Sequence, residues 1–333
     1  MKFGILADHQ YKQEDDVRQR MSELWDLTAT AAELGWDSIH AINHFVGNLQ
    51  TPQTITVLAN LVRESGDMTV GTSLLILPPF HPVHIAEEFA TLDQLSGGRL
   101  VLGVGAGYRN PEFHALGVDK TSRFRKMRES IQVIRALWAG GPVHHEGEFY
   151  NLDGHVIGIR PYQDGGPPIW IGAGGMKAIQ QAAVHGDAWI MPGNAPTEGW
   201  FEKATQVYRE ALVEAAKPLE PREYPMTINL FVGETTEQAR ELVYPYLRDE
   251  YLAYAEYPQL AFQRERFDFM WENRFVIGSP DDVTAKLEEY AALGVNHFIA
   301  RCSWIGFDHQ HTLDSMRLFS KEVMPRFAGT KQD

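Results

Sequence analysis

The sequence of 333 residues predicts a parallel (β/α)8 barrel. Short apolar runs, typical of strands buried on both faces, alternate with longer segments of helical periodicity. Eight such strands, each followed by helical sequence, succeed one another along the chain, and this order favours a barrel. Periodicity alone leaves an open doubly wound sheet as the alternative. We expect a single domain over residues 1–333.

The strands and helices can be placed in order from apolar runs and helix-capping residues. The predicted strands cover 3–7, 38–42, 69–75, 99–104, 168–171, 188–191, 226–232 and 296–301. The predicted helices cover 15–34, 52–64, 82–95, 121–138, 176–185 and 200–216, one begins at 235 or 236, and the last covers 313–323. Ser279, followed by proline and two acids, marks the start of a further helix.

Two segments interrupt this alternation. Residues 139–168 are rich in glycine, proline and histidine, so we expect an insertion before the fifth strand that contains a short hairpin. Residues 251–275 are aromatic and charged without a clear period, and we expect a second irregular segment there.

Composition narrows the class of protein. The net charge of −14 argues against a nucleic-acid-binding protein, because such a protein needs basic surface to neutralise phosphates. Cys302 is the single cysteine, which excludes an internal disulfide and a multi-cysteine metal site. No apolar run reaches the ~18 residues of a spanning helix, and the first residues lack a signal peptide, so we expect a cytoplasmic protein without membrane contact.

Two glycine clusters follow predicted strands. Gly103, Gly105 and Gly107 alternate at the end of the fourth strand, where they allow close approach of a ligand or of another backbone. They do not complete a dinucleotide fingerprint, because Tyr108 occupies the third glycine position. The second cluster runs from Ala173 through Gly174 and Gly175 into a helix, where free N–H groups can hold a phosphate. Tight packing and a plain strand–helix turn are the alternatives.

Polar residues at strand ends are candidates for catalysis, because the ends of barrel strands face the active site. His44 follows the second strand and can exchange a proton near neutral pH, although a packing histidine is the alternative. Asp8 and His9 follow the first strand, and Tyr108 and Arg109 follow the glycine strand. We predict no metal site, because the H-x-x-H spacing of the histidines at 81 and 84 lacks the glutamate of a zinc-protease motif.

Several segments together resemble the bacterial luciferase-like family of flavin-dependent oxidoreductases, which includes members that use coenzyme F420. The matching segments occur in the family's order and cover about residues 3–328. They are INHF at 42–45, the stretch from TSLLILPPFHP to GAGYRNPEF at 72–113, PPIWIGAGG at 167–175, HGDAWI at 185–190, and IGSPDDV with the closing EVMPRF.

The resemblance implies a (β/α)8 barrel with a flavin-type ring at its mouth. It places a non-proline cis peptide between Ser73 and Leu74, and it assigns proton transfer to His44 and positioning of the ring or substrate to Asn43. It also implies that backbone amides at 173–175 hold the phosphate of the cofactor, within a larger set of cofactor contacts. These contacts would come from Gly105, Ala106, Gly107, Tyr108, Ala173, Gly174 and Gly175.

Three functions follow from this resemblance. The favoured one is a two-component monooxygenase, which uses reduced FMN from a separate flavin reductase, and O2, to oxygenate a small organic substrate. The second is hydride transfer with coenzyme F420, and the third is a non-catalytic flavin-binding protein. Light emission is not expected, because Asn43 and Ala106 replace a histidine and an arginine of the luciferases. Asp8, His9 and Arg109 are candidates for substrate or lid contacts, and the family implies a homodimer.

Overall fold

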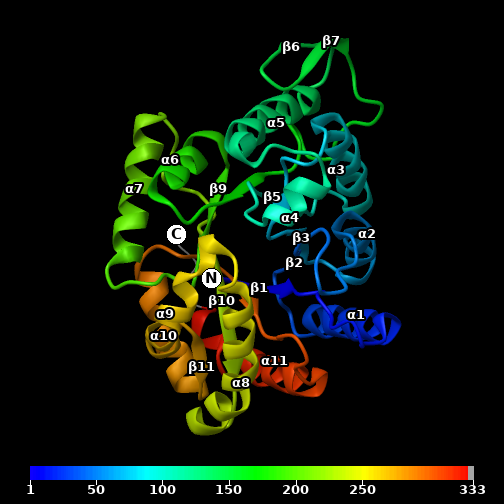
Figure 1. Ribbon diagram of the computed structural model, residues 1–333. Helices are drawn as coiled ribbons and strands as arrows, with labels where there is room; N and C mark the ends of the chain where they lie inside the picture. Colours follow the sequence, from blue (N-terminus) through cyan, green and yellow to red (C-terminus); the bar gives the residue numbers. More distant parts are fainter. Residues whose placement is uncertain (329–333) are drawn as a thin grey trace.

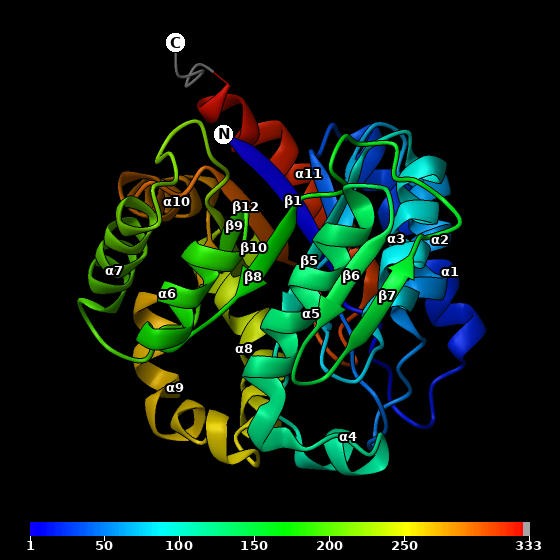
Figure 2. The same cartoon turned by 90° about the horizontal axis from the view of Figure 1, so that it is seen from above.

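The computed structural model describes residues 1–328 and confirms the predicted barrel. The parallel sheet closes, since β1 pairs with both β2 and β12, and β10 pairs with both β9 and β12. Helices surround it on the outside (Figure 1, Figure 2). The barrel strands are β1 Lys2–Ala7, β2 Ser38–Ala41, β3 Thr69–Thr72 with its continuation β4 Leu75–Ile76, β5 Leu100–Gly105, β8 Ile169–Gly172, β9 Ala188–Pro192, β10 Pro225–Val232 and β12 His297–Arg301.

The helices confirm most of the predicted positions. Ser279 caps α10 as expected, because its Oγ accepts a hydrogen bond of 3.3 Å from the N–H of Asp282. The helices are α1 Val17–Glu33, α2 Thr54–Glu64, α3 Pro82–Ser96, α4 Asn110–Ala115, α5 Arg123–Trp138, α6 Met176–His185, α7 Trp200–Glu214, α8 Thr236–Tyr254, α9 Phe262–Asn273, α10 Pro280–Ala292 and α11 His309–Glu322, with short 3-10 turns η1 Lys120–Ser122, η2 Pro258–Leu260 and η3 Met324–Phe327.

The insertion before the fifth barrel strand contains the expected hairpin. Strands β6 Val143–Glu146 and β7 Asn151–His155 pair antiparallel beside α5 (Figure 1). Glu129 on α5 fixes the hairpin turn, because Oε1 accepts the N–H groups of Phe149 at 3.1 Å and Tyr150 at 2.9 Å. These bonds lower the pKa of Glu129, although burial opposes them.

The expectation of an irregular segment at 251–275 is wrong. The end of α8, the turn η2 and all of α9 occupy it, and a short strand β11 Val276–Gly278 follows and pairs with β10. The inward positions of α9 are Gln263, Phe267, Met270 and Trp271, which is helical spacing that begins with a polar residue. Because of that glutamine, apolar residues alone do not reveal the helix.

The barrel interior is layered, with alternate residues of each strand facing inward. At the amino-terminal end, His40 and His297 both lie next to Ser38 Oγ, at 3.0 and 2.8 Å. An apolar layer of Val101, Trp170, Ala188, Ile190 and Ile299, with Leu6 and Leu74 against it, comes next. Charged residues appear above this layer, at the carboxyl-terminal end. The apolar layer therefore separates two polar regions within one barrel.

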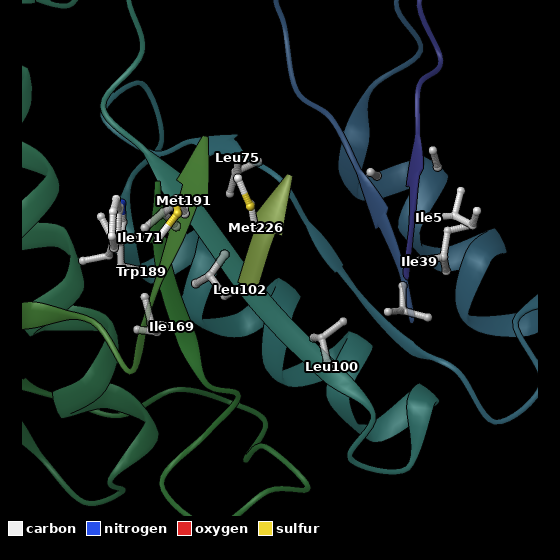
Figure 3. Packing of buried hydrophobic residues seen from close by; sticks show 14 of the residues in the cluster. Ile5, Ile39, Leu75, Leu100, Leu102, Ile169, Ile171, Trp189, Met191 and Met226 are labelled. Atoms are coloured by element: carbon white, nitrogen blue, oxygen red, sulfur yellow. The ribbon is translucent and has the colours of Figure 1, made fainter. Parts of the chain in front are cut away.

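The main core lies between barrel and helices. Leu100 and Leu102 of β5, Ile169 and Ile171 of β8, and Met226 of β10 belong to it (Figure 3). All five side chains are buried. Burying a side chain of this size stabilises the fold by roughly 1.5–3 kcal/mol, so this core holds the strand ends in place.

Candidate active site

A cavity of about 710 Å³, here named the main cavity, opens at the carboxyl ends of the barrel strands. A second cavity of about 380 Å³, the side cavity, shares Leu6, His44 and Leu74 with it. Active sites of barrel enzymes lie at this end. The walls of the main cavity contain most of the predicted site residues, namely Asn43, His44, Ser73, Leu74, Gly105, Ala106, Gly107, Tyr108, Ala173, Gly174 and Gly175.

The floor of the main cavity is built around Leu74. The peptide bond between Ser73 and Leu74 is cis, as predicted. A Cβ atom added at Gly172 would lie 2.2 Å from Leu74 Cδ1, and one at Gly105 would lie 3.0 Å from it. The two glycines therefore make room for the leucine. Ser73 Oγ is buried in the cavity wall and has no hydrogen-bond partner within residues 1–328.

The turn from Ala173 to Gly175 lies at the start of α6. A Cβ at Gly174 or Gly175 would meet nothing within 4 Å, and no side chain caps the helix. Trp189 fixes the turn from outside, since its Nε1 donates a 2.8 Å hydrogen bond to the carbonyl of Ala173. The backbone N–H groups at the start of α6 thus remain available to an anion, and the helix dipole favours one.

His44 is held by Glu112 of α4. Its Nδ1 lies 2.9 Å from Glu112 Oε1, which also accepts the N–H of Phe45 at 3.0 Å. We assign the proton to Nδ1, because this oxygen already acts as an acceptor. Burial lowers the pKa of His44, and the hydrogen bond that the ring donates to Glu112 opposes this effect. The ring is therefore neutral at pH 7, and Nε2 can accept a proton.

Asn43 lines the main cavity and is hydrogen-bonded to protein groups on both sides. Its Nδ2 donates to Thr54 Oγ1 at 3.0 Å, and its Oδ1 accepts the N–H of Ile76 at 3.0 Å. These bonds engage both ends of the amide with protein groups. Asn43 therefore joins the end of β2 to α2 and β4 and fixes this part of the cavity wall.

Aromatic rings pack together at one side of the two cavities, where Tyr108 forms part of both walls. Tyr108 lies edge-to-face against Tyr257, with ring centroids 5.5 Å apart. Arg109 was a candidate for substrate contact, but it lines neither cavity and is buried beside these rings. Its guanidinium lies 5.0 Å from the ring centroid of Tyr257 and 5.3 Å from that of Tyr254, so it acts as a cation–π support.

Charged groups gather in the side cavity. Arg301 on β12 donates to Asp8 after β1 and to Glu250 on α8. Burial raises the pKa of Glu250 to about 7, with Arg301 opposing the rise and Asp8 adding to it. Asp8, a predicted candidate for substrate or lid contact, lines the side cavity.

His9 does not reach either cavity. The side chain is fully buried, and Nδ1 lies 3.0 Å from the carbonyl oxygen of Ala7. The alternation of a strand explains this error, because Leu6 and Asp8 share the inner face and His9 must leave it. Burial lowers the pKa of His9, as expected for a packed neutral histidine.

Sequence reasoning missed three residues of this region. Arg301 ends the eighth barrel strand, so the argument that selected His44 would also have selected it. Glu112 lies within the quoted motif but has no periodic signal of its own. Glu250 lies in the interior of α8, where a glutamate is ordinary, so no sequence pattern marks it.

Comparison with known proteins identifies the family. The sequence model described as luciferase-like monooxygenase matches residues 1–297. This chain belongs to the luciferase-like monooxygenase family. The resemblance drawn from the glycine and histidine motifs is thereby confirmed.

Characterised relatives of this luciferase-like protein span nearly its whole length. It is 28% identical over 320 residues to an F420-dependent glucose-6-phosphate dehydrogenase from Amycolatopsis mediterranei, covering 91% of this chain and 94% of the relative. It is 28% identical to a 5,10-methylenetetrahydromethanopterin reductase from Archaeoglobus fulgidus, covering 98% and 99%. The chain is thus similar to oxidoreductases, some of which use F420.

Solved structures of the luciferase-like family share the fold. The monooxygenase RslO1 from Streptomyces bottropensis superposes with a TM-score of 0.89 at 23% identity, covering 98% of this chain and all (100%) of that one. The oxygenating constituent of 3,6-diketocamphane monooxygenase from Pseudomonas putida, in complex with FMN, gives 0.83 at 21% identity, covering 98% of each chain. An F420-dependent secondary alcohol dehydrogenase gives 0.79 at 20%, covering 97% and 98%.

In residues 1–328, none of the helices combines the length and apolar character needed to cross a membrane.

Proposed function

We propose that this chain transfers a hydride between coenzyme F420 in the main cavity and a small organic substrate in the side cavity. The observation that carries the proposal is the pair of His44 and Glu112. A neutral imidazole, held through one nitrogen, presents its other nitrogen at the wall that both cavities share. Such a group serves as a general base, and loss of a hydride from an alcohol requires removal of the hydroxyl proton.

The main cavity fits a flavin-type ring with a phosphate-bearing tail. Leu74, with space made by Gly105 and Gly172, would support the ring, and the buried Ser73 Oγ would hydrogen-bond to its polar edge. The open turn at Gly174 and Gly175 would hold the phosphate. The bound cofactor would supply the hydride-transfer chemistry.

A groove next to the phosphate turn favours F420 over FMN. It has a volume of about 590 Å³ and includes Gly172, Ala173 and Gly175 of the main cavity. Arg128 of α5 and Lys177 of α6 line it. FMN ends at its phosphate, whereas the side chain of F420 continues into a series of carboxylates. The two cations therefore suit the longer anionic tail, and the names of the relatives in the glucose-6-phosphate dehydrogenase group support the same cofactor.

The protein's own groups divide the remaining work. His44 Nε2 accepts the substrate proton, while Glu112 fixes the ring and stabilises the imidazolium that forms. Tyr108 and Tyr257 cover the mouth, and the largely apolar walls keep water from the reacting atoms. Asn43 keeps β4 in place behind Leu74 through Ile76.

The two-component monooxygenase remains the second candidate. The phosphate turn fits the terminal phosphate of FMN as well, and apolar walls suit oxygen chemistry. This function would require O2 and a separate flavin reductase as partner. A non-catalytic flavin-binding protein is less favoured, because the buried polar groups of the side cavity have no use in simple flavin storage.

An anaerobic fluorescence titration tests the cofactor, using the eight tryptophans as reporters. We expect tight binding of F420 and its reduction when small alcohols are added. Binding of reduced FMN alone, followed by substrate-dependent O2 consumption, would transfer the assignment to the monooxygenase. Arg128→Gln and Lys177→Gln should weaken F420 and leave FMN unchanged. Lys203→Gln, on the exposed face of α7, is the matched control.

We further propose that the protein is a cytoplasmic homodimer. Light scattering of the purified chain measures the assembly directly, and a monomer at micromolar concentration would contradict it.

A further inference from the structure

The side cavity contains a charge cluster that the hydride transfer does not use. Asp8, Glu250 and Arg301 have side chains that are 7%, 2% and 14% exposed. One terminal nitrogen of the guanidinium donates to Asp8 and the other to Glu250. Within residues 1–328, Arg301 is the one lysine or arginine that lines this cavity. Two carboxylates thus share one cation, and no free cation faces a ligand.

Unused acceptors surround this cluster. Gln10 and Gln263 line the side cavity, and each side chain is about nineteen-twentieths buried. Neither Oε1 atom has a hydrogen-bond partner in the described part of the chain. Gln10 is oriented by its Nε2, which donates to Tyr254 Oη at 2.8 Å. Because buried acceptors require donors, these two oxygens favour a ligand with O–H groups.

Two tyrosines supply donors in the same cavity. Tyr254 Oη accepts from Gln10, and Tyr251 Oη accepts from Asn229 Nδ2 at 2.9 Å. Burial raises the pKa of both phenols, so each keeps its proton. Each hydroxyl can therefore donate to a ligand oxygen. The cavity offers both donors and acceptors, which is the arrangement that recognises hydroxyl groups.

We propose that the side cavity is the substrate site and that it selects neutral substrates with several hydroxyl groups against phosphorylated or carboxylated ones. The inference deepens the proposed function and rests on it for the place where the hydride is exchanged. At pH 8, above the pKa of about 7 of Glu250, a phosphate dianion would face two carboxylates in a buried site, where repulsion is strong. The phosphate group also replaces a hydroxyl donor by acceptors, so that position of the substrate can no longer donate to Gln10 or Gln263.

This selection differs from the substrate in the name of the Amycolatopsis relative, a glucose-6-phosphate dehydrogenase. Glucose and glucose 6-phosphate differ by one phosphate group and therefore test the selection directly. Myo-inositol and its 1-phosphate form a second such pair. Ligand-observed NMR at pH 8, where Glu250 is ionised, measures the affinity of all four for the full chain without any cofactor. We expect each neutral polyol to bind at least about tenfold more tightly than its phosphate. Equal or tighter binding of the phosphates would overturn the inference, and so would absence of binding by both neutral polyols.

Glu250→Gln tests the residue basis of the selection. The substitution keeps the size of the side chain and removes one charge, so the preference for the neutral partner should fall by about tenfold. Asp249→Asn removes the same charge from the adjacent, exposed position and should leave the preference within about twofold. Asp8→Asn provides a second route if Glu250→Gln fails to fold, as judged by circular dichroism. An unchanged preference in the folded variant would reject the carboxylates as its source.

The experiments can reject the proposed hydride transfer and the proposed substrate selection independently of each other. Absence of F420 and FMN binding in the fluorescence titration would remove the proposed function and leave the sugar affinities as measured. Normal F420 reduction combined with tight binding of phosphates would leave the hydride transfer standing and remove the selection.

Discussion

His44 Nδ1 lies 2.9 Å from Glu112 Oε1, and this contact joins the end of β2 to the short helix α4. Glu112 is 1% exposed, so the carboxylate that orients the histidine is itself shielded from water. Its Oε2 has no hydrogen-bond partner within residues 1–328, and Arg109 Nη1 lies 4.0 Å from Oε1. The histidine is therefore held through Nδ1 at the wall that the two cavities share, and the proposed function uses its other nitrogen as the base.

Replacing His44 by glutamine should abolish most turnover and leave cofactor binding nearly unchanged. General bases contribute about 10²–10⁴-fold to rate, and the substitution removes the base without enlarging the cavity. Steady-state kinetics and the fluorescence titration measure the two quantities. His114→Gln, on the exposed end of α4, is the control. Full activity in the His44 variant would exclude it from the mechanism.

The pH profile should change when Glu112 is replaced by glutamine. His44 acts as a base only while it is unprotonated. Because its pKa lies below the ordinary 6.5, the wild-type rate should fall only when the pH drops below 6.5. Glu112 raises this pKa, and its removal should move the acid limb to still lower pH. A plot of kcat/KM against pH measures the limb. A shift to higher pH would contradict the assigned contact.

Two glycine substitutions should have opposite consequences. A Cβ at Gly103 would lie 1.9 Å from the backbone oxygen of Thr72, so Gly103→Ala should destabilise the fold by about 1–3 kcal/mol. A Cβ at Gly174 meets nothing within 4 Å, so Gly174→Ala should fold normally and weaken cofactor binding instead. Urea unfolding and the cofactor titration separate the outcomes. Equal stability losses would show that Gly174 is a packing residue.

His40 should make the barrel sensitive to acid. Burial, with the neighbouring His297 adding to it, lowers the pKa of His40 to about 3. In the unfolded chain His40 binds a proton below about pH 6.5, whereas in the folded chain it stays neutral down to about pH 3. The free energy of unfolding therefore keeps its full value above pH 6.5 and decreases as the pH falls toward 3. The loss is up to ~1.4 kcal/mol per pH unit. The free energy of unfolding should depend less on pH in His40→Gln between pH 7 and 5. Equal slopes would contradict this account.

Much of the fold could be predicted because buried parallel strands are short apolar runs between glycines and prolines. The barrel strand at 188–192, for example, is apolar throughout. The failure at α9 has a physical cause, since Gln263 faces the side cavity and occupies a position where an apolar residue would reveal the helix. Strand β11 has three residues, too few for any pattern.

Site residues could be predicted where the alternation of a strand determines which side chains face the barrel interior. His44 and Asp8 share the inner face with Ile42 and Leu6, whereas His9 alternates away from it. The same rule, applied strictly, would have rejected His9. Glu250 could not be found in this way, because its place in the site depends on how α8 packs across the barrel mouth.

The walls of the side cavity that come from Glu250, Tyr251, Tyr254, Leu260 and Gln263 lie in one continuous stretch of chain between β10 and β11. The turn from Ala173 to Gly175 and the floor around Leu74 follow earlier strands. Changes in this one stretch can therefore reshape the side cavity while most of the main-cavity wall, which the earlier strands supply, stays the same; only Gln259, Leu260 and Phe262 of the stretch line the main cavity. Residues 236–273, from the start of α8 to the end of α9, could therefore be exchanged as one segment between relatives to change the wall of the side cavity.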